Sequence, residues 1–378
     1  MHLRTRSASE GPIRLWLPFP VIPAHPETSS RTSALPRIGI TLGDPGGIGP
    51  EVIVKALADE SLRSSAHMLI LGPQWPLLHA AGLAGIRPYW STCTDANACA
   101  KSMAAGPSCI VLDESPASDP LFGPSSRWPT SANARAGEVS FALVERAIAL
   151  AQAGELDAIV TGPINKHAWS LAGHTRYPGH TELFAERFQS DDDRWGMMFH
   201  APRINESGHA LNVILATAHM PLMKVGPSLT IGRVLDAIVL GQRACIDLGV
   251  DSPRVAVCGL NPHAGEAGLL GTEDDAIITP AIEAAREQGI DCLGPFPGDT
   301  IFTAAVRGDF DLVVAMYHDQ GLIPVKLLAR DRAVNMTVGL PVVRTSPDHG
   351  TAFDISGKNV ADPGSMKAAI ALALRALK

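Results

Sequence analysis

The sequence has few charged and few aromatic residues. Only 18% of its 378 residues are Asp, Glu, Lys or Arg and 5% are Phe, Trp or Tyr, whereas 46% are hydrophobic, which excludes disorder for most of the chain. The net charge is −7 without a long run of Lys or Arg, so nucleic acid is not expected as a partner. No apolar stretch reaches the roughly 18 residues of a membrane span, so a membrane protein is not expected either.

Paired cysteines are also missing. None of the six cysteines forms a C-x-x-C pair, which argues against zinc-finger and thioredoxin-like sites. Cysteines scattered through a chain of this length indicate reduced, buried side chains in a cytoplasmic protein.

The first 36 residues differ from the rest of the chain. They are rich in Arg, Ser and Pro and hold only two acidic residues. This composition predicts a disordered N-terminal extension over residues 1–36, although a transit peptide has a similar composition. We therefore expect the folded unit to cover residues 37–378, where the length allows two domains or one α/β unit with two lobes. The sequence does not show where one lobe would end and the other begin.

Short apolar runs alternate with amphipathic stretches in this remainder. Runs of this kind separated by helices predict a mostly parallel sheet covered on both faces. The expected strands are Arg37–Leu42, His67–Gly72, Ser108–Leu112, Asp157–Thr161, Leu211–Ala216, Arg254–Cys258, Leu312–Met316 and Val334–Val338. Helices are expected from Pro50 onward and near Gly137–Ala153, Ile231–Leu248, Asp275–Gln288 and Ser365–Leu377.

The dinucleotide-binding fingerprint G-x-G-x-x-G is absent after the first expected strand. Residues Gly43–Gly49 read G-x-x-G-G-x-G instead. Such a loop before a helix could bind an anion, or it could be a tight turn that lets the strand and the helix pack closely. The residues that contact a nucleotide cofactor are therefore not predicted.

Three histidines follow the carboxyl ends of expected strands, where α/β proteins place their sites. They are His219, His263 and His318. A structural role is the simpler explanation for any single one of them. Three imidazoles in the same topological position, however, favour a shared divalent metal site with open coordination positions for a substrate.

Two further polar segments are candidates for substrate binding. The sequence Gly-His-Thr occurs twice, at Gly173–Thr175 and Gly179–Thr181, and only the second copy continues into Glu182 and a helical pattern. The segment 317–351 is dense in polar groups. Within it Lys326, Asn335 and Arg344 could hold a phosphate or a carboxylate.

Seven motifs in one order resemble those of the 4-hydroxythreonine-4-phosphate dehydrogenase family of vitamin B6 biosynthesis. The resemblance runs from about residue 37 to the C-terminus. The motifs are GDPGGIGPEV at 43–52, TGPINK at 161–166, PGHTE at 178–182, NPHAGE at 261–266, GPFPGDT at 294–300, YHDQGLIPVK at 317–326 and VNMTVGLPVVRTSPDHGTAFDI at 334–355.

This resemblance implies a three-layer α/β/α fold like that of isocitrate and isopropylmalate dehydrogenases, with a mostly parallel sheet and two lobes around a cleft. It implies a homodimer with an active site shared across the interface, NAD or NADP, and one divalent metal such as zinc, magnesium or cobalt. The implied metal ligands are His219, His263 and His318, and the implied substrate contacts are His180, Thr181, Lys326, Asn335 and Arg344. Asp299 and Asp319 are weaker candidates for proton transfer or cation support.

The reaction implied by the resemblance is oxidation of the secondary alcohol of 4-phosphohydroxy-L-threonine. The resulting 3-oxo acid loses CO₂ to give 3-amino-2-oxopropyl phosphate. Three departures from the family pattern leave the substrate open, namely Gly298 where Ala is common, the sequence Ala-Thr-Ala before His219, and an apparent short insertion at Pro202–Ala210. D-threonate 4-phosphate and D-erythronate 4-phosphate are the alternatives within the family. A phosphoacyl transferase with a related fold is a more distant one.

Overall fold

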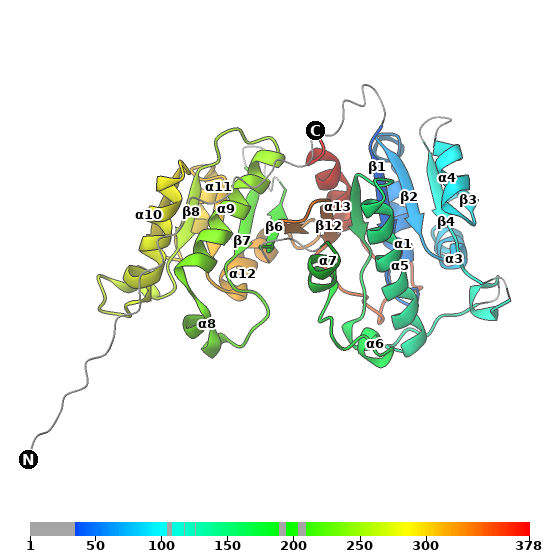
Figure 1. Ribbon diagram of the computed structural model, residues 1–378. Helices are drawn as coiled ribbons and strands as arrows, with labels where there is room; N and C mark the ends of the chain where they lie inside the picture. The colour runs from blue at the N-terminus through cyan, green and yellow to red at the C-terminus, as the bar shows by residue number, and fades with distance from the viewer. Residues whose placement is uncertain (1–34, 104–107, 117, 125, 189–193, 203–208) are drawn as a thin grey trace, which may run out of the picture. The chain divides into compact units, whose positions relative to one another are not determined.

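A computed structural model describes residues 35–103, 108–116, 118–124, 126–188, 194–202 and 209–378 (Figure 1). The predicted N-terminal extension lies outside the described residues, apart from Leu35 and Pro36. No helix among the described residues has the length and hydropathy to cross a membrane.

The strands of the described part of the chain form one sheet. Its order is β3-β4-β2-β1-β5-β12-β11-β6-β7-β10-β8-β9. The strands are β1 (Arg37–Thr41), β2 (His67–Leu71), β3 (Ser91–Cys93), β4 (Cys109–Leu112), β5 (Ala158–Thr161), β6 (Gly196–Ala201), β7 (Leu211–Leu215), β8 (Val255–Cys258), β9 (Cys292–Phe296), β10 (Leu312–Ala315), β11 (Val334–Val338) and β12 (Val343–Pro347).

Most neighbouring strands run parallel, so the predicted class of a mostly parallel α/β sheet is confirmed. The exceptions lie in the middle of the sheet, where β6 is antiparallel to β7 and β11, and β11 is antiparallel to β12. Neither β6 nor β12 is predicted from the sequence. β6 contains no β-branched residue, and β12 carries a buried arginine, so neither resembles a typical apolar strand.

Helices connect the strands and cover the sheet. Every residue of β5 and β7 is buried, as expected for strands covered on both faces. The helices are α1 (Gly49–Leu57), α2 (Glu60–Arg63), α3 (Gln74–Ala84), α4 (Ala96–Met103), α5 (Ala134–Gln152), α6 (Lys166–Leu171), α7 (His180–Phe188), α8 (Leu222–Ser228), α9 (Ile231–Asp247), α10 (Thr279–Glu287), α11 (Ile301–Arg307), α12 (His318–Ala329) and α13 (Gly364–Arg375), with short 3₁₀ or π segments η1 (Pro120–Phe122), η2 (Pro262–Gly265) and η3 (Asp274–Ile278).

The long helix α5 shows how local sequence sets an element in place. The Asn133 side chain caps it by accepting a hydrogen bond from the Ala136 N–H at 2.9 Å. Ala136, Ser140, Val144 and Ala147 are buried, and their spacing places them on one face of the helix. This face packs on β1, β2 and β5.

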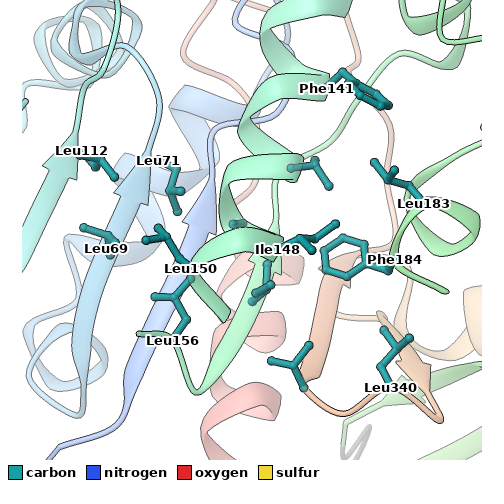
Figure 2. Packing of buried hydrophobic residues seen from close by; sticks show 14 of the residues in the cluster. Leu69, Leu71, Leu112, Phe141, Ile148, Leu150, Leu156, Leu183, Phe184 and Leu340 are labelled. Atoms are coloured by element: carbon teal, nitrogen blue, oxygen red, sulfur yellow. The ribbon is translucent and has the colours of Figure 1, made fainter. Parts of the chain in front are cut away.

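A hydrophobic cluster lies between α5, α7 and the sheet (Figure 2). Its members include Phe141 and Ile148 of α5, Leu69 and Leu71 of β2, and Phe184 of α7. A second buried cluster joins β7, β10 and α12. Both clusters lie beside one cavity, because α7 and α12 contribute residues to the clusters and to the wall of that cavity.

Candidate active site

A cavity of about 340 Å³ lies where the antiparallel strands meet the starts of α7 and α12. Its wall draws on β5, β6, β11 and β12 as well as on these two helices. Polar side chains on the wall include Lys166, His180, Thr181, Glu182, His219, His318, Lys326, Asn335, Arg344, Ser346, Asp348 and His349.

All five residues predicted to contact substrate line this cavity. His180 and Thr181 form the first turn of α7, and Lys326 lies on α12. Asn335 and Arg344 lie on the paired strands β11 and β12. The structure therefore brings together residues that are up to 164 positions apart in sequence, the separation between His180 and Arg344.

Arg344 is the most deeply buried charge on the wall, with 1% of its surface exposed. Its guanidinium donates to the hydroxyls of Thr337 at 3.0 Å and Thr161 at 2.5 Å, and it lies 5.6 Å from the ring centroid of Phe184. Burial lowers the pKa of Arg344 to about 9, which still leaves the group charged at neutral pH. A buried cation without a carboxylate at bonding distance is a strong site for an anion.

Four buried polar atoms of the cavity wall have no hydrogen-bond partner among the described residues. They are His180 Nε2, Asn335 Oδ1, Arg344 Nε and His349 Nε2. Each unsatisfied buried group costs about 1–3 kcal/mol, so a ligand that supplies the missing partners would be favoured. Burial also lowers the pKa of His180 well below its usual value, so this imidazole is neutral and offers one donor and one acceptor.

His219 and His318 face each other across the cavity. Their ring centroids are 5.6 Å apart, and both side chains line the wall. The two loops are tied together because Thr217 donates its hydroxyl to the Met316 carbonyl at 2.7 Å. Burial and the neighbouring Lys166 lower the pKa of His219, which keeps this imidazole neutral and able to bind a metal.

His263 does not reach this cavity in its own copy. It follows β8, as predicted, but its side chain is 67% exposed and its nearest ionic partner is Glu266 at 3.3 Å. Among the described residues no group of three His, Cys, Asp or Glu side chains is arranged to hold a metal ion. One copy of the chain thus brings together two of the three predicted ligands.

The two predicted acidic residues lie outside the cavity wall. Asp319 Oδ1 lies 2.7 Å from His318 Nδ1, which is hydrogen-bonding distance. The carboxylate can therefore orient the His318 ring, and it does not line the wall where a substrate would bind. Asp299 is exposed and does not line the cavity. A Cβ on the neighbouring Gly298 would lie 2.9 Å from Gln320 Nε2, so glycine at this position leaves room for that amide.

Four further polar residues line the cavity, and the sequence predicts no role for them: Lys166, Glu182, Asp348 and His349. Two of them end the recognised motifs TGPINK and PGHTE, and this was the available signal. Asp348 lies 3.4 Å from Lys326 Nζ, and burial raises the pKa of Asp348 despite this cation.

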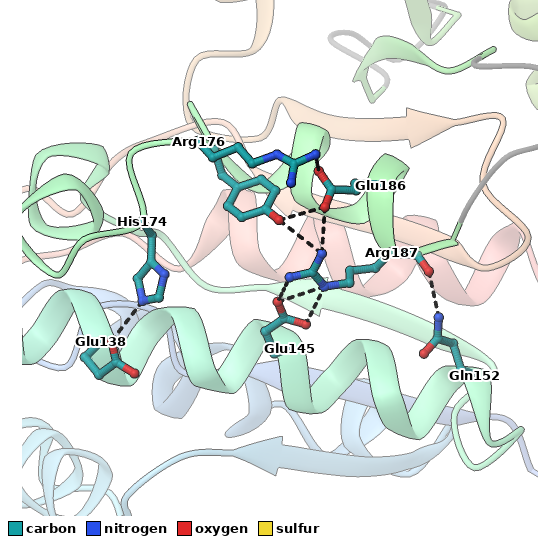
Figure 3. Close-up of polar contacts among 8 residues, drawn as sticks. Glu138, Glu145, Gln152, His174, Arg176, Glu186 and Arg187 are labelled. Atoms are coloured by element: carbon teal, nitrogen blue, oxygen red, sulfur yellow. Dashed lines mark hydrogen bonds and ion pairs between the residues drawn. The ribbon is translucent and has the colours of Figure 1, made fainter.

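A polar network fixes α7, the helix that presents His180 (Figure 3). Arg187 near its end forms a forked ion pair with Glu145 of α5, with distances of 2.6 and 3.0 Å. The same guanidinium donates to the Tyr177 hydroxyl and pairs with Glu186, both at about 3 Å. Helix α7 is therefore held against α5 by directed contacts as well as by apolar packing.

A second, larger cavity of about 870 Å³ adjoins the first. The two share His318, Leu322, Lys326, Asp348 and His349. Its remaining wall includes Ile48 of the glycine-rich loop, Asp319 of α12, and five residues between positions 352 and 365, namely Ala352, Ile355, Ala361, Asp362 and Ser365. A cavity of this size next to the first one can hold a cofactor beside a small substrate.

Known proteins and a family model resemble this chain over most of its length. A family model of the pyridoxal phosphate biosynthetic protein PdxA matches residues 98–373. A D-threonate 4-phosphate dehydrogenase of Cupriavidus necator is 45% identical over 89% of this chain and 96% of its own length. A 4-hydroxythreonine-4-phosphate dehydrogenase of Desulfosudis oleivorans is 44% identical over 90% of this chain and 95% of its own.

The solved structures agree. The 4-hydroxythreonine-4-phosphate dehydrogenase of Klebsiella pneumoniae has 39% identity, a TM-score of 0.75, and covers 92% of this chain and 100% of its own. A branched-chain phosphotransacylase of Enterococcus faecalis shares the fold at 12% identity and a TM-score of 0.53. The prediction of an oxidoreductase is confirmed at the level of the family, because these closer relatives are named dehydrogenases. The chain belongs to the family of the pyridoxal phosphate biosynthetic protein PdxA.

Proposed function

We propose that the protein oxidises the secondary alcohol of 4-phosphohydroxy-L-threonine with NAD or NADP, and that the 3-oxo acid decarboxylates to 3-amino-2-oxopropyl phosphate. The observation that carries this proposal is the meeting of an anion site around Arg344 with the His219–His318 pair in one cavity. The Arg344 site can hold a phosphate or carboxylate, and the histidine pair can hold a metal next to the reacting carbon.

The cavity wall supplies the groups that would bind the substrate's anions. Arg344 Nε and His180 Nε2 are buried and have no hydrogen-bond partner among the described residues, and Lys326 adds a half-exposed positive charge. Asn335 and Thr181 add neutral polar contacts. A planar guanidinium held by two threonine hydroxyls has little freedom left, so it would orient a phosphate or carboxylate as well as attract it.

The donor set fits a divalent metal. When bound, such an ion supplies Lewis-acid polarisation of the substrate's hydroxyl oxygen. His219 and His318 would hold it, and the Asp319 carboxylate would keep the His318 ring in the tautomer that leaves Nε2 free. Imidazole ligands suit zinc or cobalt better than magnesium.

The third ligand, His263, would come from a second copy of the chain. Its exposed position after β8 leaves it free to enter another subunit's cavity. Apolar side chains are exposed on the same loop and after His219, since Leu269 is 78% and Met223 is 86% exposed. These observations support the predicted homodimer with a shared active site. The cytoplasmic location stays a prediction from the cysteine pattern.

The larger cavity would hold the nicotinamide cofactor. When bound there, the cofactor would supply the acceptor for the hydride of the oxidation. Ile48 and Ile355 offer apolar contacts on the wall, and Ser365 and Asp362 offer polar ones. Because five residues belong to both cavities, a ligand in each would meet at His318, Lys326 and Asp348.

Proton transfer would fall to groups at this junction. Burial raises the pKa of Asp348, and this carboxyl lies 3.4 Å from Lys326 Nζ, so it would be the group at the junction that takes up or releases a proton. Asp319 would act through His318. Asp299 remains a weaker candidate, because it contacts neither cavity in its own copy.

D-threonate 4-phosphate is the second candidate substrate. One specific observation favours it, namely the 45% identity to an enzyme named for that substrate, against 44% for an enzyme named for 4-hydroxythreonine 4-phosphate. The two compounds differ at C2, where one carries an ammonium and the other a hydroxyl. Both carry the phosphate and the carboxylate that the anion site would recognise.

Formation of reduced nicotinamide tests the proposal. Purified protein would be supplied with NAD or NADP, a divalent metal, and either 4-phosphohydroxy-L-threonine, D-threonate 4-phosphate or D-erythronate 4-phosphate. We expect turnover of the first compound, lost on adding a chelator and restored by excess metal. Preference for a sugar-acid phosphate would move the proposal to the second candidate, and no reduction with any of them would overturn it.

A further inference from the structure

The loop that carries His263 has an unusual backbone. We call residues 259–271, between β8 and the segment that leads to η3, the His263 loop. Six consecutive residues in it, 263–268, have positive φ, and four of them are not glycine: His263 (54°), Ala264 (53°), Glu266 (46°) and Ala267 (55°). L-residues avoid this region, and isolated ones are the rule where they occur. A run of this length persists only where surrounding contacts hold it.

Backbone hydrogen bonds within the loop support this run, and Asp274 holds the residues that lead into it. This carboxylate is fully buried at the start of η3. It accepts the Leu260 N–H at 2.8 Å through Oδ1, and through Oδ2 it accepts the Asn261 N–H at 3.2 Å and the Asn261 side-chain amide at 2.8 Å. The amide also donates to Glu273 at 2.8 Å. One side chain thus binds both residues that precede Pro262 and His263.

Two glycines pack closely against Asp274 and its partner Asn261. A Cβ on Gly259 would lie 2.6 Å from Asp274 Oδ1, and a Cβ on Gly271 would lie 2.5 Å from Asn261 Nδ2. At its base the loop is also tied to α12, because Gln320 donates to the Gly259 carbonyl at 2.8 Å. The exposed imidazole of His263 therefore stands on a rigid base, although little touches the imidazole itself.

We propose that Asp274 is a positioning residue for the metal site: it holds the His263 loop in the form that delivers the imidazole to a second copy of the chain. This inference rests on the proposed function, in which His263 is the third ligand. The reason is energetic. A loop held in its binding form before the metal arrives loses little conformational freedom on binding, so the metal is bound more tightly.

Metal binding by the intact, metal-free protein tests this role. The affinity for Co²⁺ would be measured by competition with a chelating dye, and the visible spectrum of bound Co²⁺ would report its ligands. Asp274→Asn keeps one oxygen acceptor but places an NH₂ group opposite N–H donors of the loop, so hydrogen bonds that hold the loop are lost. We therefore expect about 10- to 100-fold weaker binding of Co²⁺. The spectrum should shift toward that of His263→Ala. Asp275→Asn, at the exposed neighbouring position, is the matched control and should bind as the wild type does.

A second variant covers the case in which Asp274→Asn does not fold. Asn261→Ala removes the side-chain amide that bridges Glu273 and Asp274 without leaving a buried charge unpaired, and it should weaken Co²⁺ binding in the same direction. Wild-type affinity and spectrum in a folded variant of either kind would overturn the inference. If His263→Ala itself leaves Co²⁺ binding unchanged, the proposed metal site fails instead, so the two failures can be told apart.

Discussion

Arg344 shows at the scale of one residue why the sequence predicts a binding site better than it predicts a strand. A charged group buried to this degree is costly unless it is compensated, and here two threonine hydroxyls and a phenyl ring compensate it only in part. Its position after an apolar run favours a functional role. The same arginine makes β12 hard to predict from the sequence, because a strand that contains Arg, Ser and Pro lacks the apolar pattern of a typical strand.

We predict that Arg344→Lys impairs substrate binding more than folding. Lysine keeps the charge but cannot bond both threonines and a ligand at once, so KM for the phosphorylated substrate should rise about 10- to 100-fold. Steady-state kinetics and the melting temperature would be compared with those of Arg233→Lys, an exposed position on α9. An unchanged KM in the Arg344 variant would contradict the assignment of this residue to the anion site.

The two histidines in Gly-His-Thr sequences, His174 and His180, have different surroundings in the structure. His174 stacks on Phe141 with ring centroids 3.6 Å apart and pairs with Glu138 at 2.8 Å, whereas His180 lines the cavity. The family motif, with its following glutamate, selects His180 correctly as the cavity residue. Local sequence alone leaves the choice open, because both histidines follow glycine and precede threonine.

At the scale of elements, the glycine-rich loop before α1 holds a buried carboxylate. Asp44 is fully buried, and its Oδ1 accepts the Gly46 N–H at 2.9 Å, whereas Oδ2 has no partner among the described residues. Burial raises the pKa of Asp44 to about 6. The folded state therefore holds a proton that the unfolded state has already lost between about pH 4 and pH 6, so stability falls as the pH rises through this window.

We predict that Asp44→Asn is more stable than the wild type above about pH 6, by about 1–3 kcal/mol in the free energy of unfolding. Asparagine keeps the acceptor for Gly46 and carries no charge to bury. Urea denaturation across this pH range measures the difference, which should shrink as the pH approaches 4. A difference that does not change with pH would show that Asp44 is not protonated in this way.

The polar network on α7 gives a second prediction for an element. Arg187→Met removes the fork to Glu145 and the contact with Tyr177, so α7 and its His180 should loosen (Figure 3). Because both partners are about one-third exposed, we expect a loss of only about 1 kcal/mol of stability, together with a higher KM.

Arg146→Met is the control for the α7 prediction. It removes a similar fork, between α5 and Glu114, that does not contact α7. Chemical denaturation and steady-state kinetics of both variants separate the effects. An equal rise in KM in the two variants would argue against a specific role of the α7 anchor.

The order of strands and helices is largely predictable because apolar runs report burial directly. Expected strands such as Asp157–Thr161 and Arg254–Cys258 agree with β5 and β8 to within one residue. The antiparallel insertion of β6 and β11 into the sheet is not predictable in this way. The β6–β11 pairing joins segments more than 100 residues apart, and the pattern within one segment does not show which distant strand it pairs with. The antiparallel pairs β6–β7 and β11–β12 are close in the sequence, but β6 and β12 lack the residue pattern of a typical strand.

At the scale of the whole molecule, the buried residues of the described part of the chain include one cluster around α5 and α7 and another around β7, β10 and α12. The predicted division into two lobes stays a prediction. The sequence identifies the three histidines that follow strands as candidate metal ligands. It does not show whether each of them would bind the metal in its own subunit or in the partner subunit. Exposure favours a second copy for His263, because this residue lies away from the pair that lines the cavity.

The central claim is an active site built by two copies of the chain, and mixed dimers test it most directly. Two differently tagged variants, His263→Ala and His318→Ala, would be co-expressed and the mixed dimer isolated. One of its two sites would keep all three histidines, so we predict about half the wild-type activity, although each variant alone is inactive. The mixed dimer of His219→Ala and His318→Ala should be inactive, because both ligands come from the same copy. Inactivity of the first mixed dimer would contradict the account.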